Sequence, residues 1–424
     1  MEQEIQEITK QLQASAREYW PEIQRSHRWE FQVLRWCMDD PSLRTQVLRF
    51  MDCLPALQEP RQIAQHLQEY FPEASGRLPL PLRVGLAATR SGLVTARAAA
   101  AVTRQTATAI ARLFLAGATL DDAAGPIRRL EAQGFRITLD LLGEATVSEA
   151  EADRVLQAYR DAVQRWSALF SSPIHLSLKL SSLAFPFDPV DPEGAWRRIL
   201  PRARPLFQAI LDRGGFLNID MEQYQLRDLT LSLTQRLLEE CFPAASSVGV
   251  VIQAYLKDAE PCTRRLLDWA ARRGVPITVR LVRGAYWDSE VLLARQREWP
   301  CPVYTEKSET DASYERLIDL LLENHSVVRT AVATHNLRSI ARAVAQARRL
   351  SVPQERWECQ MLFGMSEAMQ QAVRQAGIPL RIYTPVGDLI PGMAYLVRRI
   401  LENTSQYSFL AAGIADMEGK PVGV

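Results

Sequence analysis

From about residue 134 onward, the chain alternates short β-rich apolar runs with segments of helical spacing. The segments 149–171, 196–212 and 338–350 repeat their apolar residues with the period of one helix face. Eight strand candidates, each followed by a helix candidate, predict a (β/α)8 barrel. A doubly wound open sheet would alternate in the same way, but no G-x-G-x-x-G motif follows any of the runs. The barrel is therefore favoured, with strands in 135–144, 174–180, 215–221, 248–255, 276–284, 327–335, 357–364 and 380–387.

The part of the chain before the barrel has a different texture. It is predicted to be helical, with helices over 4–18 and 60–70 and a tryptophan-rich stretch between them. A proline-rich GRLPLP segment then reads as a linker, and an Ala-, Arg- and Thr-rich stretch follows it. We expect three domains: a helical arm at 1–75, a helical linker at 76–130 and the barrel at 131–424.

Composition excludes several classes of protein. With 50 Lys+Arg against 49 Asp+Glu, the chain lacks the basic excess of a nucleic-acid-binding protein. The six cysteines are scattered without a C-x-x-C pair, and no zinc-type histidine motif occurs, so reduced thiols and no metal site are expected. The N-terminus has no signal-peptide pattern, and arginines interrupt the most apolar stretch. These features predict a soluble, cytoplasmic protein.

Costly polar residues gather near the ends of the predicted strands, where a barrel places its active site. Any one of them has a structural alternative: a lysine in an apolar run can extend outward to solvent, and paired arginines can form a solvated helix face. Burying them together costs several kcal/mol each unless a ligand compensates, and their positive excess suits an anionic ligand. They are Lys179, Asp220, Gln253, Arg280, Arg283, His335, Asn336 and Tyr383, with Arg398, Arg399 and Glu402 on the following helix and Glu144 after the first strand.

At these residues the sequence resembles the proline dehydrogenase family, especially the N-terminal half of the bifunctional proline utilisation A proteins. The resemblance runs from about residue 114 to 410, and the block with paired arginines is its most diagnostic part. The blocks are LDLLGEA, SLKLSSL, NIDMEQY, VIQAYLKDA, VRLVRGAYWDSE, YTEKSETDASYERL, ATHN, QMLFGM, RIYTPVG and YLVRRILENTS.

The resemblance implies a distorted TIM barrel, preceded by a helical arm, that holds FAD at the strand C-termini and oxidises L-proline to Δ1-pyrroline-5-carboxylate. Arg398, Arg399 and Lys179 match the residues that grip the substrate carboxylate. Asp220 matches the residue that holds the lysine and an arginine in place. The ring-packing positions are Tyr383 and Leu362, and Glu144 matches an acidic gate residue.

The resemblance also implies a cofactor site. Arg280 matches an arginine beside flavin N5, where a fixed cation favours hydride acceptance. A bulky Tyr383 implies a preference for proline over trans-4-hydroxy-L-proline, and the proton acceptor for the substrate amine stays open. The remaining FAD positions are Gln253, Arg283, Gly284, Ala285, Tyr286, Trp287, Thr305, Lys307, Thr334, His335, Asn336 and Glu402.

Further expectations rest on the resemblance alone. A quinone is the expected electron acceptor, with peripheral association at the inner membrane, and a Δ1-pyrroline-5-carboxylate dehydrogenase is an expected partner. The helical arm is a candidate oligomerisation element. No DNA-binding or aldehyde dehydrogenase module is recognisable in the sequence, so a stand-alone enzyme and a domain of a longer chain both stay open.

Two other functions compete with this one. Lys179 could be the Schiff-base nucleophile of an aldolase or lyase, since such lysines occur at barrel strand ends. An inactivated, non-catalytic barrel is the second alternative. The cation-rich strand ends oppose the first, and competent residues at every implied catalytic position oppose the second.

Overall fold

The computed structural model describes residues 1–26, 45–46, 49–50, 53–57, 59–70, 100–101, 103, 105, 112, 114–143 and 146–388. Residue contacts divide the chain into two compact units. The first unit comprises Met1–Ser15, Ala124–Met361 and Met369–Thr384, and it contains every polar network described below. The second comprises Ala16–Ala123, Leu362–Ala368 and Pro385–Val424.

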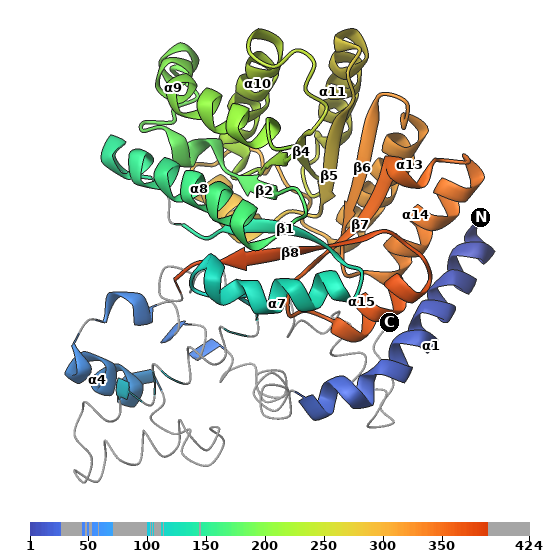
Figure 1. The fold of residues 1–424 in the computed structure, drawn as a ribbon, viewed down its shortest axis with the longest axis horizontal. Coiled ribbons are helices and arrows are strands. Elements are labelled where there is room, and N and C mark those ends of the chain that lie inside the picture. Colours follow the sequence, from blue (N-terminus) through green and yellow to red (C-terminus); the bar gives the residue numbers. More distant parts are fainter. Residues whose placement is uncertain are drawn as a thin grey trace. The chain divides into compact units, whose positions relative to one another are not determined.

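Eight strands form a closed barrel in sequence order (Figure 1). Parallel pairing joins each strand from β1 to β6 to the next, for example through Leu176↔Leu217 and Val250↔Val279. Every predicted strand is confirmed, which also confirms the α/β barrel. The strands are β1 Arg136–Leu141, β2 His175–Leu178, β3 Phe216–Ile219, β4 Val248–Gln253, β5 Ile277–Val282, β6 Val328–Ala333, β7 Trp357–Leu362 and β8 Leu380–Val386.

Helices connect successive strands, and two of them, α12 and α13, lie between β5 and β6. The predicted helix over 196–212 begins earlier, because the Asp191 side chain accepts from Gly194 N at 2.8 Å and Pro192 occupies the first turn. The helices are α7 Leu120–Ala132, α8 Glu149–Leu169, α9 Pro192–Leu211, α10 Tyr224–Glu240, α11 Ala259–Arg273, α12 Trp287–Gln296, α13 Lys307–Glu323, α14 Leu337–Arg349 and α15 Glu367–Gln375, with 3-10 helices at Leu54–Ala56, Leu180–Leu183 and Gln354–Arg356.

The apolar core lies outside the barrel strands, under the helices. Leu176 of β2, Phe207 of α9 and Ile340 of α14 are all fully buried. Inside the barrel the character changes, because hydrogen bonds cross the lumen between strands that are not neighbours. Arg280 of β5 reaches Ser177 of β2, for instance. The interior is therefore a polar network rather than layers of aliphatic side chains.

Two helices of the N-terminal part lie within the described residues. Helix α1 spans Glu2–Ser26, which is longer than the predicted 4–18, and α4 spans Pro60–Tyr70 as predicted. The GRLPLP segment and most of the expected linker lie outside the described residues, and the domain boundaries at 75 and 130 stay predictions. No helix in the described part of the chain is both long and apolar enough to span a membrane.

Candidate active site

Three of the predicted site residues, Asp220, Arg280 and Tyr383, meet at the C-terminal ends of the strands, which we call the barrel mouth. Asp220, directly after β3, joins two distant strands: its Oδ1 accepts from Arg280 of β5 at 2.7 Å, and its Oδ2 accepts from the Tyr383 hydroxyl of β8 at 2.9 Å. Asn218, two residues earlier on the same face of β3, donates to Asp220 Oδ1 at 3.0 Å. One carboxylate thus fixes side chains from three strands.

Arg280 lies at the centre of this network and is 3% exposed. Its Nη1 also donates to Ser177 Oγ at 3.0 Å, and its guanidinium lies 5.2 Å from the centre of the Tyr383 ring. No described residue accepts a hydrogen bond from its buried Nε or Nη2. Buried donors of this kind are costly unless a ligand completes them.

Lys179 follows β2 directly and faces an acidic surrounding. The Asp140 carboxylate of β1 raises the pKa of Lys179 most strongly, against the effect of burial, and Asp220 adds to it. Asp140 is 2% exposed, and burial raises the pKa of its carboxyl while Lys179 opposes that rise. No residue in the described ranges accepts a hydrogen bond from Lys179 Nζ, so this protonated amine is available to an anionic ligand.

Gln253, the last residue of β4, is 3% exposed and borders the same space. Its Nε2 donates to the Glu222 carbonyl at 3.0 Å, whereas its buried Oε1 meets no donor among the described residues. The Glu222 side chain accepts from Ser181 Oγ at 2.5 Å, and burial raises the pKa of that carboxyl. Gln253 therefore presents an uncompensated acceptor on β4, the strand that pairs with the strand of Arg280.

Arg283, after β5, belongs to a second network that extends to α13 and α14. It donates to Asp311 Oδ1 at 2.8 Å, to Thr334 Oγ1 at 2.6 Å and to Ser339 Oγ at 3.0 Å. Lys307 on α13 pairs with the other oxygen of Asp311. Three predicted cofactor residues, Arg283, Thr334 and Lys307, are thus brought together by one carboxylate and one hydroxyl.

The segment after β5 passes close to a buried ring. Gly284 has a φ of +129°, and a Cβ there would lie 2.6 Å from atoms of the Tyr255 ring. Only glycine fits this approach and this conformation. Trp287 begins α12 and is 39% exposed, with its indole N–H bonded to the Tyr304 carbonyl at 2.8 Å.

The other predicted site residues have these places. Ala285 and Tyr286 lie between Gly284 and α12, and Thr305 is exposed before α13. His335 is half-buried between β6 and α14, and Asn336 caps α14 by accepting from Ser339 N at 3.0 Å. Leu362 ends β7 and is half-buried. Glu144, Arg398, Arg399 and Glu402 lie outside the described residues.

Sequence reasoning missed Asp140, Ser177 and Glu222. A signal for the first two was present, because polar residues recur at every second position of several strands and a strand places alternate residues on one face. Such alternation predicts a polar lumen. It occurs in Thr138–Asp140, His175–Ser177–Lys179, Asn218–Asp220, Glu358–Gln360 and Arg381–Tyr383.

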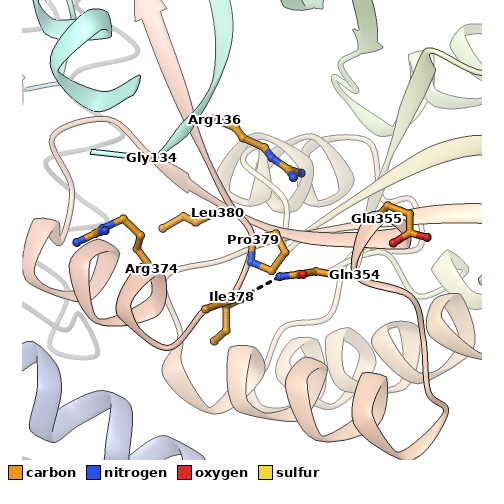
Figure 2. A pocket seen from close by; sticks show the side chains of 9 residues that line it. Gly134, Arg136, Gln354, Glu355, Arg374, Ile378, Pro379 and Leu380 are labelled. Carbon is orange, nitrogen blue, oxygen red and sulfur yellow. Dashed lines mark hydrogen bonds between the residues drawn. The ribbon is translucent and has the colours of Figure 1, made fainter. Parts of the chain in front are cut away.

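A surface cavity of about 380 Å³ lies at the other end of the barrel, where β1 and β8 begin (Figure 2). Two arginines, Arg136 and Arg374, line it, and Gln354 at its edge donates to the Gly377 carbonyl at 3.1 Å. Arg136 already pairs with Glu358 at 3.3 Å and has a half-exposed side chain. Because Arg136 is already paired and the cavity lies away from the C-terminal ends of the strands, it is a weaker candidate than the barrel mouth.

Comparison with known proteins gives two family matches. The family model described as proline dehydrogenase matches residues 123–412, and the model described as proline utilization A N-terminal domain matches residues 2–114. Together they cover both the barrel and the helical part before it.

Individual relatives agree with these matches. The bifunctional protein PutA of Klebsiella aerogenes is 33% identical over 311 residues, 70% of this chain and 24% of the relative. Proline dehydrogenase 1 of Bacillus subtilis is 31% identical over 304 residues, 72% of this chain and 90% of the relative. A crystal structure of proline utilization A from Bdellovibrio bacteriovorus, inactivated by N-propargylglycine, has a TM-score of 0.82 and 33% identity over 99% of this chain and 43% of that one. The match to this chain therefore spans about a quarter of the length of the curated PutA relatives.

Proposed function

Because the chain belongs to the proline dehydrogenase family, we propose that it oxidises L-proline to Δ1-pyrroline-5-carboxylate with FAD as the hydride acceptor. The observation that carries the proposal is the barrel-mouth network, in which Asp220 fixes Arg280 and Tyr383 beside a lysine with unused donors. Anion binding and a fixed cation beside the reacting group are the two demands of this reaction.

The residues of the barrel mouth fit a flavin. Arg280 has two buried nitrogens, and Gln253 one buried oxygen, without partners among the described residues, so together they offer donors and an acceptor to a polar ring edge. Gly284 leaves the backbone uncovered beside Tyr255. These three residues would hold the isoalloxazine, and Arg283, Thr334 and Lys307 would serve the rest of the cofactor. FAD, when bound, supplies two-electron hydride acceptance.

The proposed proline site consists of charged side chains that bind the carboxylate and side chains that contact the ring. Lys179 would donate to the substrate carboxylate, together with Arg398 and Arg399. The Tyr383 ring, held by its hydrogen bond to Asp220, would pack on the pyrrolidine ring. Leu362 and Glu144 would complete the pocket as ring contact and gate.

The Schiff-base alternative is disfavoured by electrostatics. A lysine nucleophile must lose its proton, and enzymes achieve this by lowering its pKa. Asp140 and Asp220 instead raise the pKa of Lys179. Borohydride reduction in the presence of a carbonyl substrate should therefore attach nothing to this lysine.

The proposal extends to partners. Electrons would leave to a quinone, and a Δ1-pyrroline-5-carboxylate dehydrogenase would consume the product. The location would be cytoplasmic, with peripheral contact to the inner membrane, and the arm would support oligomerisation. Anaerobic turnover with a water-soluble quinone tests the electron acceptor. Co-flotation of the protein with lipid vesicles tests the membrane contact.

The visible spectrum of the purified protein tests the central proposal. Flavin absorption near ~450 nm that bleaches on anaerobic addition of L-proline would support both cofactor and substrate. A colourless protein that FAD does not reconstitute would remove the proposal. A yellow protein that proline leaves unbleached would retain the cofactor and exclude proline.

A further inference from the structure

Asp140 is a buried carboxyl for which the proposed reaction has so far given no role. It is 2% exposed, lies in β1, and is the register neighbour of Ser177 on β2. Neighbours across parallel strands point to the same side, and residues two apart on a strand share a face. Asp140, Ser177 and Lys179 therefore face the lumen together.

Asp140 and Asp220, the two aspartates that face Lys179, differ in the hydrogen bonds that they accept. Asp220 accepts a short ion-pair hydrogen bond from Arg280, a second hydrogen bond from Tyr383 and a third from Asn218. Asp140 has Oδ1 buried without a donor among the described residues, and the Tyr383 hydroxyl lies within hydrogen-bonding reach of its carboxyl. Among the described residues, Lys179 acts on the Asp140 carboxyl more strongly than Arg280 does, and Arg280 is hydrogen-bonded to Asp220.

We propose that Asp140 is a positioning residue that keeps Lys179 protonated from a distance and so leaves all three Nζ donors free for the substrate carboxylate. Direct contact would occupy one or more of those donors, and no acceptor in the described part of the chain does so. A buried charge acts over several ångströms because the lumen is little screened. The identity of the bound carboxylate rests on the proposed function, but the protonation state of Lys179 does not.

Other ionisable groups also face Lys179, and their effects on its protonation must be distinguished from the effect of Asp140. The phenols favour the charged lysine only if they ionise, and burial raises the pKa of Tyr159, which makes ionisation harder. Glu222 is held by Ser181. Asp220 is therefore the competing explanation. The full set that surrounds Lys179 is Asp140 on β1, Asp220 and Glu222 after β3, Tyr159 on α8 and Tyr286 before α12.

Competitive acetylation tests this without any need for turnover. The chain has only five lysines, Lys10, Lys179, Lys257, Lys307 and Lys420, so peptide mass spectrometry can follow each one. Exposed Lys257 is the internal reference. With the purified full chain at pH ~9, Asp140→Asn should raise the acetylation rate of Lys179, relative to Lys257, at least ~tenfold, because each unit of pKa is a factor of ten in free amine. Asp220→Asn should raise it less.

Asp311→Asn is a matched control, because Asp311 pairs with Lys307. It should leave the acetylation rate of Lys179 unchanged. An unchanged Lys179 rate in Asp140→Asn, or a larger rise in Asp220→Asn, would overturn the proposal.

Wild-type protein keeps the proposal falsifiable if Asp140→Asn does not fold. A Lys179 that titrates at or below the ordinary lysine pKa of about 10.4 would also overturn it. Where turnover is measurable, Asp140→Asn should raise KM for L-proline increasingly above pH ~8 and change kcat less, and Asp140→Glu should restore the wild-type pH dependence. Failure of proline oxidation would leave the acetylation result intact, so the two proposals fail separately.

Discussion

At the residue scale, the barrel mouth depends on a few side chains that hold one another in place. Tyr383 gives its hydroxyl to Asp220 and its ring face to Arg280, so its position is fixed from two sides. Gly284 contributes by having no side chain. The site therefore depends both on hydrogen bonds between side chains and on a position where a side chain is absent.

Tyr383→Phe should keep the ring and lose the hydrogen bond to Asp220. A hydrogen bond to a charged group contributes about 1.5–3 kcal/mol, so kcat/KM for L-proline should fall about 10- to 100-fold. Steady-state kinetics would measure this. Tyr224→Phe removes a phenolic hydroxyl from a ring that stacks on Arg227 of α10, and it should have little effect. Equal kinetics for Tyr383→Phe and wild type would show that the hydroxyl does not hold the ring.

Gly284→Ala should displace the Tyr255 ring and strain the backbone. Strain at a left-handed position costs of order 1–3 kcal/mol, and the clash adds to it, so the melting midpoint and the bound FAD content should both fall. Gly274→Ala is the control, since φ is +70° there but no atom lies within 4 Å of the new Cβ. If Gly274→Ala lowered the melting midpoint as much as Gly284→Ala, the Tyr255 contact would not matter.

At the scale of elements, the strands are joined inside the lumen by ion pairs as well as by the sheet. Arg381 of β8 binds Glu358 of β7 through two hydrogen bonds, at 2.6 and 3.1 Å, and also donates to the Ile137 carbonyl of β1 at 2.9 Å. This one side chain links the last strands to the first where the barrel closes. Burial would raise the pKa of Glu358, but Arg381, Gln360 and Arg136 together outweigh burial and hold that pKa below its ordinary value.

Glu358→Gln should therefore flatten the acid dependence of stability. A carboxyl with a lowered folded pKa stabilises the fold above its ordinary pKa of 4.5, and this contribution is lost as pH falls below that value. Above pH ~5 the variant should be less stable by about 3–5 kcal/mol, because Arg381 loses its buried partner. Thermal melts from pH ~4 to 7 would measure both effects. A wild type and a variant with parallel pH profiles would contradict the assignment.

At the scale of the whole molecule, the start of the chain belongs to the same compact unit as most of the barrel. Glu2 pairs with Arg338 of α14 at 2.6 Å, and Ser15 donates to Gln375 at the end of α15 at 2.7 Å. Between them, Ile5 and Leu12 are at most 2% exposed (Figure 1 shows α1 in dark blue). The first half of α1 is therefore part of the barrel's outer layer.

Ile5→Ala and Leu12→Ala should each destabilise the barrel, and not only α1. Loss of a large buried aliphatic side chain costs about 2–5 kcal/mol, so the temperature at which the barrel unfolds and releases flavin should fall by several degrees. Gln6→Ala, exposed on the same helix, should leave it unchanged. If α1 melted separately while the barrel transition stayed in place, its attachment would be energetically minor.

The sequence by itself determined the barrel, the place of each strand to within a few residues, and the gathering of charge at the strand ends. These follow from local periodicity and from one rule about barrels, and neither depends on which side chains meet. Family motifs then supplied the expected roles. The start of α9 differed because a capping aspartate and a proline, rather than the first apolar residue, set its boundary.

Only the tertiary structure decided the pairing inside the lumen. Lys179 and Asp220 were both expected at the site. The sequence did not show that Arg280 binds Asp220 or that Asp140 faces Lys179. Both depend on the register of β1 and β2 and on contacts across the barrel. Residues 140 and 383 are far apart in sequence, and no local pattern encodes their meeting. Local preferences set the elements, whereas burial and the closure of the sheet determine which charges share one dry space.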